Sequence, residues 1–304
     1  MPSASISCAT LAVEPWAGVP GPVMRPLLHA ECTRWAVDLG WDLARDWAAV
    51  EPARRSGLLP GWVAHTPDGH IAGWAFAADG LDRRQLGALV ADDGEVAVRL
   101  LRGGVLAGIE ALGGFIRTTP TVNAGVFQSV SHSVQPYHYL VRQLGYGEPF
   151  GTAELSSETW QDADAESVAD LFRQAYAADR SLRPFARVGT HEDWCDYVDA
   201  LTRRPGCGVF SPESSVVVRE GHTLLGVALV TSVGPTTAHL AQIAVTPAAR
   251  TRGLGGALLA EAMRRASRHL RASRLSLLVS DANQSACRLY TRAGFHPEGE
   301  FLAL

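Results

Sequence analysis

Arginines and glycines are closely spaced at residues 250–256, in the segment RTRGLGG. The preceding residues 239–245 are largely apolar and should form a strand that ends at Pro247, which has no N–H to donate. The following residues carry apolar side chains three and four apart, which predicts an amphipathic helix. A helix N-terminus presents unpaired N–H groups and partial positive charge, and glycines let a phosphate approach them closely. The spacing therefore predicts a pyrophosphate site, unless these glycines serve only the packing of a strand-to-helix turn.

A second buried strand is expected over residues 274–280, followed by a short helix. Asn283 is placed to cap that helix. One face of the helix would carry Ala286, Leu289 and Tyr290. Gly294 should end the helix before Phe295 begins another strand.

Taken together, these two segments resemble the signatures of the GCN5-related N-acetyltransferases (GNAT). Two patterns carry the resemblance: Arg250-x-x-Gly253-x-Gly255, and Asn283-x-x-Ala286-x-x-Leu289-Tyr290 followed by Gly294-Phe295. The resemblance covers residues 152–304. It implies acetyl-CoA or another acyl-CoA as the acyl donor, and no metal.

The resemblance also implies roles for individual residues. Backbone groups of Ile243, Ala244 and Val245 would pair with the pantetheine arm of the donor like an added strand. Asn283 would help to orient this arm, and Tyr290 would protonate the departing thiolate. The pyrophosphate would be held by Arg250, Thr251, Arg252, Gly253, Leu254, Gly255 and Gly256.

The general base that takes a proton from the attacking ammonium is less clearly marked. Family members often use a carboxylate on the strand that matches residues 239–245, or a chain of waters. Gln242 occupies a position expected to face the site, and its amide cannot titrate. His239 is the local candidate, because histidine titrates near neutral pH. The alternatives, near the ends of the following strands, are Asp281, Glu298 and Glu300.

The composition is that of a soluble globular protein, with 304 residues of which 47% are apolar and 19% charged. Such a length suits two domains. A net charge of −4 gives no reason to expect nucleic acid or an anionic membrane as a partner. Five cysteines without zinc-like spacing favour a reducing, cytoplasmic location. No apolar run is long enough to span a bilayer, and the N-terminus lacks the basic start of a secretion signal.

A weak internal repeat predicts two copies of one fold. Hairpins are expected at residues 62–77 and 216–230, and a helical stretch at residues 96–112. The first copy would close with a helix ending at residues 144–147, as the second does at residues 293–296. The predicted fold class is α/β (α+β), with two tandem GNAT-like domains, each a mixed, mostly antiparallel sheet flanked by helices.

The expected boundaries are an N-terminal tail over residues 1–23, a first domain over 24–150 and a second over 151–304, joined near residues 149–157. Acidic residues at 92–96 replace the arginines and glycines of the second copy and would repel a pyrophosphate. Val141 aligns with Tyr290, so the first copy also lacks the proton donor. We therefore expect a degenerate, non-catalytic first domain that shapes the acceptor cleft or carries a dimer interface.

The function expected is transfer of an acetyl or other acyl group from acyl-CoA to a primary amine of a small molecule, by direct attack in a ternary complex. Natural-product tailoring, self-resistance and thiol biosynthesis are plausible contexts. Trp194, Tyr197 and Phe185 are candidates for walls of the acceptor pocket. One alternative is a longer acyl chain, on CoA or an acyl carrier protein, that acylates a peptide or amino-sugar amine. Another is a non-catalytic CoA-binding module. The protein would be a monomer or a homodimer.

Overall fold

The structure is a computed structural model that describes residues 11–79, 83–109, 111–130, 132–145, 156–177, 189–204 and 207–304. The chain divides into two compact units. Unit 1 draws on Met1–Ala30, Trp47–Tyr137 and Gly299–Leu304, and unit 2 on Glu31–Asp46 and His138–Glu298. None of the described helices combines the length and the apolar character that crossing a membrane requires.

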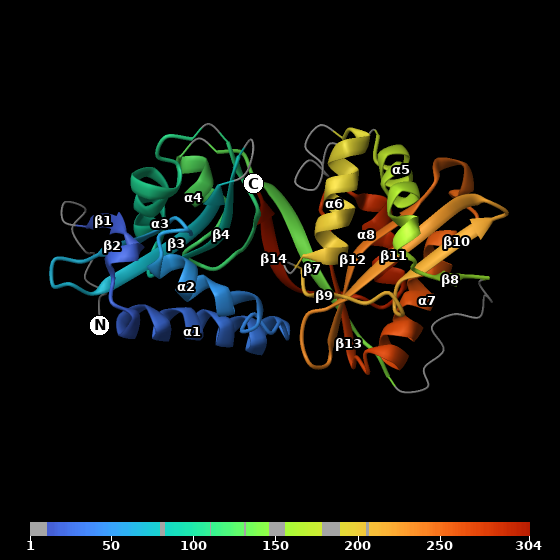
Figure 1. The fold of residues 1–304 in the computed structure, drawn as a ribbon, viewed down its shortest axis with the longest axis horizontal. Helices are drawn as coiled ribbons and strands as arrows, with labels where there is room; N and C mark the ends of the chain where they lie inside the picture. Colours follow the sequence, from blue (N-terminus) through green and yellow to red (C-terminus); the bar gives the residue numbers. More distant parts are fainter. Residues whose placement is uncertain are drawn as a thin grey trace. The chain divides into compact units, whose positions relative to one another are not determined.

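Unit 1 contains a five-stranded sheet in the order β1-β2-β3-β4-β5, of which β1 to β4 are labelled in Figure 1. Its neighbouring strands are antiparallel except for the parallel pair β4 and β5. The strands are β1 Ala12–Pro15, β2 Gly61–His65, β3 Ile71–Asp79, β4 Arg84–Ala91 and β5 Leu112–Gly113. The helices and helical turns are η1 Trp16–Gly18, α1 Gly21–Leu39, η2 Asp46–Ala49, α2 Val50–Arg55, α3 Gly94–Leu100, η3 Leu101–Val105 and α4 Ala124–Ser129. Helix α1 passes from unit 1 into unit 2 at Glu31.

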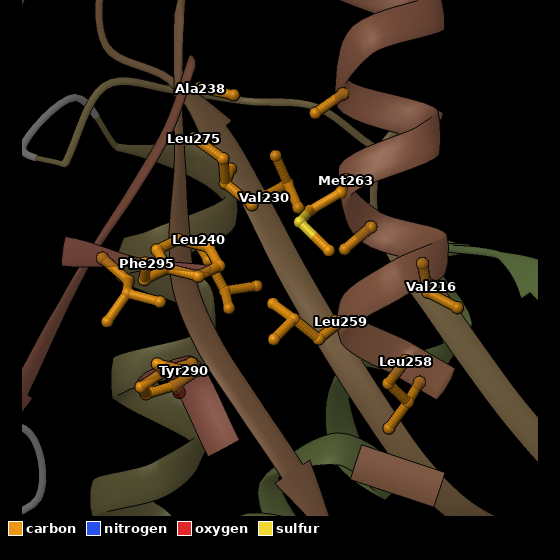
Figure 2. Packing of buried hydrophobic residues seen from close by; sticks show 14 of the residues in the cluster. Val216, Val230, Ala238, Leu240, Leu258, Leu259, Met263, Leu275, Tyr290 and Phe295 are labelled. Atoms are coloured by element: carbon orange, nitrogen blue, oxygen red, sulfur yellow. The ribbon is translucent and has the colours of Figure 1, made fainter. Parts of the chain in front are cut away.

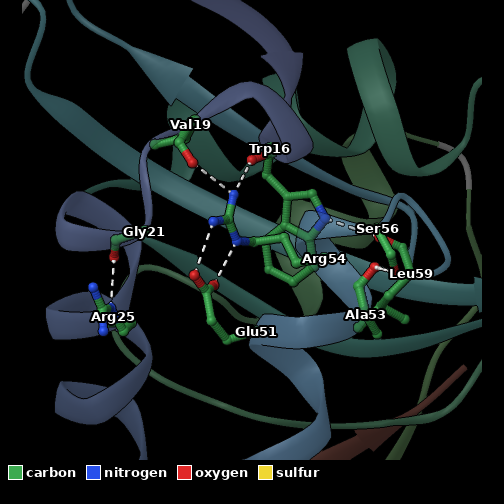
Figure 3. Close-up of polar contacts among 9 residues, drawn as sticks. All are labelled: Trp16, Val19, Gly21, Arg25, Glu51, Ala53, Arg54, Ser56 and Leu59. Carbon is green, nitrogen blue, oxygen red and sulfur yellow. Dashed lines mark hydrogen bonds and ion pairs between the residues drawn. The ribbon is translucent and has the colours of Figure 1, made fainter.

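A buried arginine ties the start of unit 1 to α2 (Figure 3). The Arg54 side chain is fully buried. Its guanidinium donates to both carboxylate oxygens of Glu51 and to the backbone carbonyls of Trp16 and Val19. A buried charge is tolerated when it is paired and hydrogen-bonded in this way. Arg54 therefore holds η1 against α2.

A nine-stranded sheet follows the order β6-β14-β7-β13-β12-β11-β10-β8, with β9 beside β11. Its strands are β6 Phe115–Arg117, β7 Gln135–Gln143, β8 Glu158–Thr159, β9 Val209–Phe210, β10 Val216–Glu220, β11 Thr223–Ser232, β12 Thr237–Val245, β13 Arg274–Ser280 and β14 His296–Ala303. The helices and turns of unit 2 are η4 Asp162–Asp164, α5 Ala165–Ala175, α6 His191–Arg203, η6 Pro247–Ala249, α7 Leu254–His269 and α8 Gln284–Arg292. Strands β7 and β14 contain residues of both units.

The two faces of the sheet in unit 2 carry separate cores, because successive side chains of a strand point to opposite faces. On β10, Val216 and Val218 belong to one core cluster with residues of α7 and α8, including Leu259 and Tyr290. Figure 2 labels Val216, Leu259 and Tyr290 of this cluster. Val217 packs instead with residues of α5 and α6. Helices α7 and α8 therefore cover one face of the sheet, and α5 and α6 cover the other.

The predicted internal repeat is visible in the order of elements. The hairpin β2–β3 and the hairpin β10–β11 are the two that the sequence predicts. The expected N-terminal tail is wrong for residues 12–23, because β1 pairs with β2 and the Trp16 side chain is 1% exposed. The helix expected over residues 96–112 ends early, because α3 passes at Leu101 into the short π-helix η3, which ends at Val105.

The expected last helix of the first copy is also wrong. Helix α4 ends at Ser129, and β7 follows it. In β7, the side chains of Tyr137, Tyr139 and Val141 are buried, and their spacing of two residues is the period of a strand. Val141 therefore does not correspond to Tyr290.

The structure offers a different correspondence between the two copies. Asn123 caps α4 as Asn283 caps α8, and Val130 follows Asn123 at the spacing of Tyr290 from Asn283. The division into compact units also differs from the expected boundary at residue 150, because most of β7 belongs to unit 2. Residues 149–155 of the expected joint lie outside the described residues.

Candidate active site

Strands β12 and β13 run side by side and then part. The last pair in their parallel register joins Leu240 to Leu277. Beyond it, β12 continues to Val245 and keeps its antiparallel pairing with β11. The end of β12 therefore has an edge without a described strand partner, which can pair with an extended ligand as with an added strand. We call this region the split.

A β-bulge in β12 lies where the split begins. The register with β11 jumps from Leu240 to Gln242, which leaves Ala241 as the extra residue. An extra residue bends its strand and increases the local twist. The bulge therefore gives a physical reason for the parting of β12 from β13.

The antiparallel ladder with β11 decides which backbone groups of β12 face the split. The Thr246 N–H donates to the Leu225 carbonyl at 2.9 Å. Since hydrogen-bonded and non-hydrogen-bonded pairs alternate along such a ladder, the backbone groups of Ala244 point to β11 as well. Those of Ile243 and Val245 point to the split. Of the three residues expected to pair with pantetheine, these two face the split and Ala244 does not.

A tyrosine at the end of α5 also reaches the split. The Tyr176 hydroxyl lies 2.9 Å from the carbonyl oxygen of Ile243 and 3.0 Å from Oε1 of Gln242. Its ring packs against Trp194 on α6, with 5.5 Å between ring centroids. In the sequence, Tyr176 fits the apolar spacing of an amphipathic helix that corresponds to α5. Its hydroxyl, directly after the last helical residue Ala175, is the feature of the sequence that could have indicated a role at the split.

The glycine-rich loop lies at the end of β12 that forms the split. Helix α7 begins at Leu254, and its N-cap Gly253 has a φ of 79° and makes no side-chain cap. The first helical hydrogen bond is from the Ala257 N–H to the Gly253 carbonyl. The N–H groups of Leu254, Gly255 and Gly256 thus precede the helical ladder and suit an anion.

The glycines of this loop leave room for a ligand. A Cβ at Gly255 would lie 3.7 Å from Leu289, and one at Gly256 would lie 3.9 Å from it, both ordinary contacts. Neither glycine is therefore demanded by the packing of the protein itself. Thr251, with a φ of 64°, holds a left-handed conformation that non-glycine residues rarely adopt. Such local strain is typical of ligand-binding turns.

The two arginines of the loop lie at the surface. Arg250 and Arg252 are exposed. The Arg250 guanidinium donates to the carbonyl oxygen of Ala175, in the last turn of α5. This contact places positive charge beside the α7 N-terminus, where a pyrophosphate would need it.

Helix α8 forms as the second signature predicts. The Asn283 side chain accepts a hydrogen bond from the Ala286 N–H at 3.1 Å, and Gly294, with a φ of 80°, follows the helix. The Tyr290 side chain is 5% exposed and packs against Phe295 (Figure 2). Burial raises the pKa of the Tyr290 hydroxyl, which is therefore a neutral donor near neutral pH.

His239 lies at the closed end of the split. Its ring is 3% exposed, and Nδ1 lies 2.9 Å from Oγ of Ser276. Burial lowers the pKa of His239 to about 3. Such an imidazole is neutral near pH 7 and has little tendency to take up a proton. Its burial argues against the general-base role expected from the sequence.

Two of the three alternative carboxylates, those of Asp281 and Glu298, have partners in the structure. Asp281 lies 3.2 Å from Nε2 of His138. Glu298 pairs with Arg274 and His296. Glu300 belongs to unit 1.

Further sequence expectations stand as follows. Gln242 is buried, with its side chain toward Tyr176. Trp194 is buried among residues of α5 and α6, and Phe185 lies outside the described residues. No group of three His, Cys, Asp or Glu residues in the described part of the chain is arranged to hold a metal ion.

Comparisons with known proteins agree with this geometry. The acetyltransferase (GNAT) family model matches residues 165–295. No curated protein sequence matches the chain.

Several solved structures are similar in fold, at identities that show the fold alone. A GCN5-related N-acetyltransferase from Sphaerobacter thermophilus has a TM-score of 0.59 and 17% identity, over 80% of this chain and 79% of that chain. A tandem GNAT protein from the clavulanic acid biosynthesis pathway has a TM-score of 0.56 and 15% identity, over 97% of this chain and 98% of that chain. A GNAT-family acetyltransferase from Colwellia psychrerythraea has a TM-score of 0.57 and 11% identity, over 96% and 98%.

The predicted fold class is confirmed, since two helix-flanked sheets of mixed α/β structure match tandem proteins of this kind over nearly their whole length. The part of the chain that matches the GNAT family model is the segment that holds the split, the glycine-rich loop and α8.

Proposed function

We propose that unit 2 transfers an acyl group from acyl-CoA to a primary amine of a small molecule. The single observation that carries this proposal is the meeting of two features at the end of β12. One is a strand edge at Ile243 and Val245 that pairs with no strand in the described part of the chain, and the other is the α7 N-terminus at Leu254, which has no side-chain cap. An extended arm that ends in a pyrophosphate fits both at once.

The donor would lie with its pyrophosphate at the α7 N-terminus and its pantetheine arm along β12. The N–H groups of Leu254, Gly255 and Gly256 would bind the phosphate oxygens, with Arg252 adding positive charge. The arm would pair with the backbone of Ile243 and Val245. The Ile243 carbonyl has two lone pairs, so it can accept from Tyr176 and from the arm together.

The reaction would proceed by direct attack. The amine nitrogen bonds to the thioester carbonyl carbon and forms a tetrahedral oxyanion, which then expels the thiolate as the C–S bond breaks. Tyr290 would give its proton to the leaving sulfur. The attacking nitrogen would lose its proton to water, because burial leaves His239 a poor base.

The first copy of the fold would not bind a second donor. At the start of α3, the Asp93 carboxylate accepts a hydrogen bond from the Val96 N–H at 2.8 Å. A side chain thus occupies the helix N-terminus that a pyrophosphate would need, and its negative charge would repel one. Val130, at the spacing of Tyr290, has no proton to donate.

The test is to incubate the protein with acetyl-CoA and a panel of amino sugars, polyamines, amino-acid amides and short peptides. One structural neighbour belongs to clavulanic acid biosynthesis, so natural-product amines join the panel. Amine-dependent release of the CoA thiol, with an N-acetylated product in the mass spectrum, is the expected result. Acetyl-CoA binding without release for any amine would favour a non-catalytic CoA-binding module instead.

A further inference from the structure

Four buried side chains fill the closed end of the split. We call them the end cluster: Trp41, Tyr139, His239 and Ser276. Their exposed fractions are 7%, 0%, 3% and 0%, and all four belong to unit 2. His239 and Ser276 are partners in the parallel pairing of β12 and β13, one residue before its last pair. The cluster thus lies directly behind the point where these strands part.

Polar contacts hold the end cluster in place. His239 Nδ1 lies 2.9 Å from Ser276 Oγ, which donates to the Ala238 carbonyl at 3.2 Å. The Trp41 indole Nε1–H donates to the Tyr139 hydroxyl at 2.8 Å. That hydroxyl lies 3.1 Å from the carbonyl oxygen of Leu39. Each ring is therefore fixed by a hydrogen bond as well as by packing.

The Trp41 indole also lies against the imidazole. The ring centroids of Trp41 and His239 are 5.0 Å apart, with an edge-on angle of 70° between the planes. Trp41 comes from the segment that follows α1, far from the rest of the split in the sequence. This segment of the N-terminal half thus completes the end of the split.

The direction of the donor follows from the order of elements. The α7 N-terminus lies after Val245, so the pyrophosphate end of a donor would lie there. The arm would then run back along β12 past Ile243, and its acyl end would point toward Leu240. On one face of the sheet, Leu240 packs with Tyr290 in the core beneath α7 and α8. On the other face lies the end cluster, because His239 and Leu240 point to opposite faces.

We propose that the end cluster stops the acyl chain of the donor and so restricts the donor to short acyl groups such as acetyl. A longer chain would have to displace the Trp41 or His239 ring, and close-packed interiors resist such insertion. The inference rests on the proposed function. It selects acetyl-CoA over the long-chain donors that the motifs leave open.

Isothermal calorimetry with acetyl-CoA, butyryl-CoA, octanoyl-CoA and free CoA tests this proposal. Wild type should bind acetyl-CoA about tenfold more tightly than octanoyl-CoA, or better. His239→Ala opens space in the cluster, so the affinity for octanoyl-CoA should rise and that for acetyl-CoA should stay within about twofold. The ratio of the acetyl-CoA affinity to the octanoyl-CoA affinity should therefore fall about fivefold. His222→Ala, at an exposed turn, is the matched control and should leave the ratio unchanged.

Trp41→Phe keeps an aromatic ring at the same place and is the second variant, in case His239→Ala does not fold by circular dichroism. It should narrow the ratio in the same direction. Equal affinity of wild type for acetyl-CoA and octanoyl-CoA would overturn the proposal, as would an unchanged ratio in a folded variant. If wild type bound no CoA species at all, the proposed function itself would fail, which is a distinct result.

Discussion

His239 and Tyr290 lie on opposite faces of the sheet in unit 2. Both neighbours of His239 on β12, Ala238 and Leu240, pack in the same core as Tyr290. The imidazole therefore points to the other face, toward Trp41. The proton donor and the base expected from the sequence do not share a face. His239 is part of the end cluster, and Tyr290 is the residue that we propose as the general acid.

The burial of His239 predicts a pH dependence of stability. The pKa of this group is lowered from 6.5 to about 3 in the folded protein, so the unfolded chain binds more protons between these values. The contribution of His239 to the free energy of unfolding is then fully present above pH 6.5 and is lost as the pH drops toward 3. Between pH 6.5 and pH 5 the contribution of His239 to the free energy of unfolding should fall by about 2 kcal/mol.

Urea unfolding at the two pH values measures this effect in wild type and in His239→Asn. Asparagine can still bond to Ser276 but cannot titrate. When the pH falls from 6.5 to 5, the free energy of unfolding of the variant should drop by about 2 kcal/mol less than that of wild type. Equal losses in the two proteins would show that His239 does not stay neutral in the folded state.

Tyr290→Phe should separate chemistry from donor binding. Phenylalanine keeps the packing with Phe295 but has no proton for the thiolate. The turnover number should fall by about 10²-fold. Acetyl-CoA affinity, measured by calorimetry, should stay within about twofold. Tyr137→Phe, which removes a hydroxyl from unit 1, is the control and should retain wild-type turnover; an equally active Tyr290→Phe would remove the general acid from the mechanism.

Asp93→Ala tests the role of the first copy. The Asp93 side chain caps α3, so its loss should lower the free energy of unfolding by about 1 kcal/mol. Acetyl-CoA affinity and binding stoichiometry should not change, because the only donor site proposed is in unit 2. Calorimetry measures the affinity and the stoichiometry, and thermal unfolding of the same sample measures the loss of stability. A second binding event for acetyl-CoA in the variant would contradict this and place a donor site in the first copy.

The sequence predicts those parts of the fold that depend on local patterns. The Gly-rich turn before α7, the Asn283 cap and the Gly294 stop are each set by residues within one turn of a helix. The two hairpins are likewise set by short turns and alternating strands. Such features need no knowledge of distant neighbours.

Other features depend on contacts between residues far apart in the sequence. Residues 135–143 form β7 because that segment joins a sheet made mainly by the second half of the chain. Trp41 reaches His239 across most of the chain length. The sequence also predicts that His239 lies on a strand of the site, but it does not show how deeply the side chain is buried. Burial depends on Trp41 and Tyr139, whose positions no local pattern specifies.

The central claim is that acyl-CoA binds at the α7 N-terminus beside the split. Calorimetry with acetyl-CoA on wild type and on Gly255→Asp tests it most directly, with Gly18→Asp at an open, exposed position as the control. A Cβ at Gly255 makes only ordinary contacts, so the variant should fold while its carboxylate repels the pyrophosphate. The account predicts that Gly255→Asp loses affinity by about tenfold or more and that Gly18→Asp binds as wild type does. Equal affinity in all three proteins, or no binding by wild type, would contradict it.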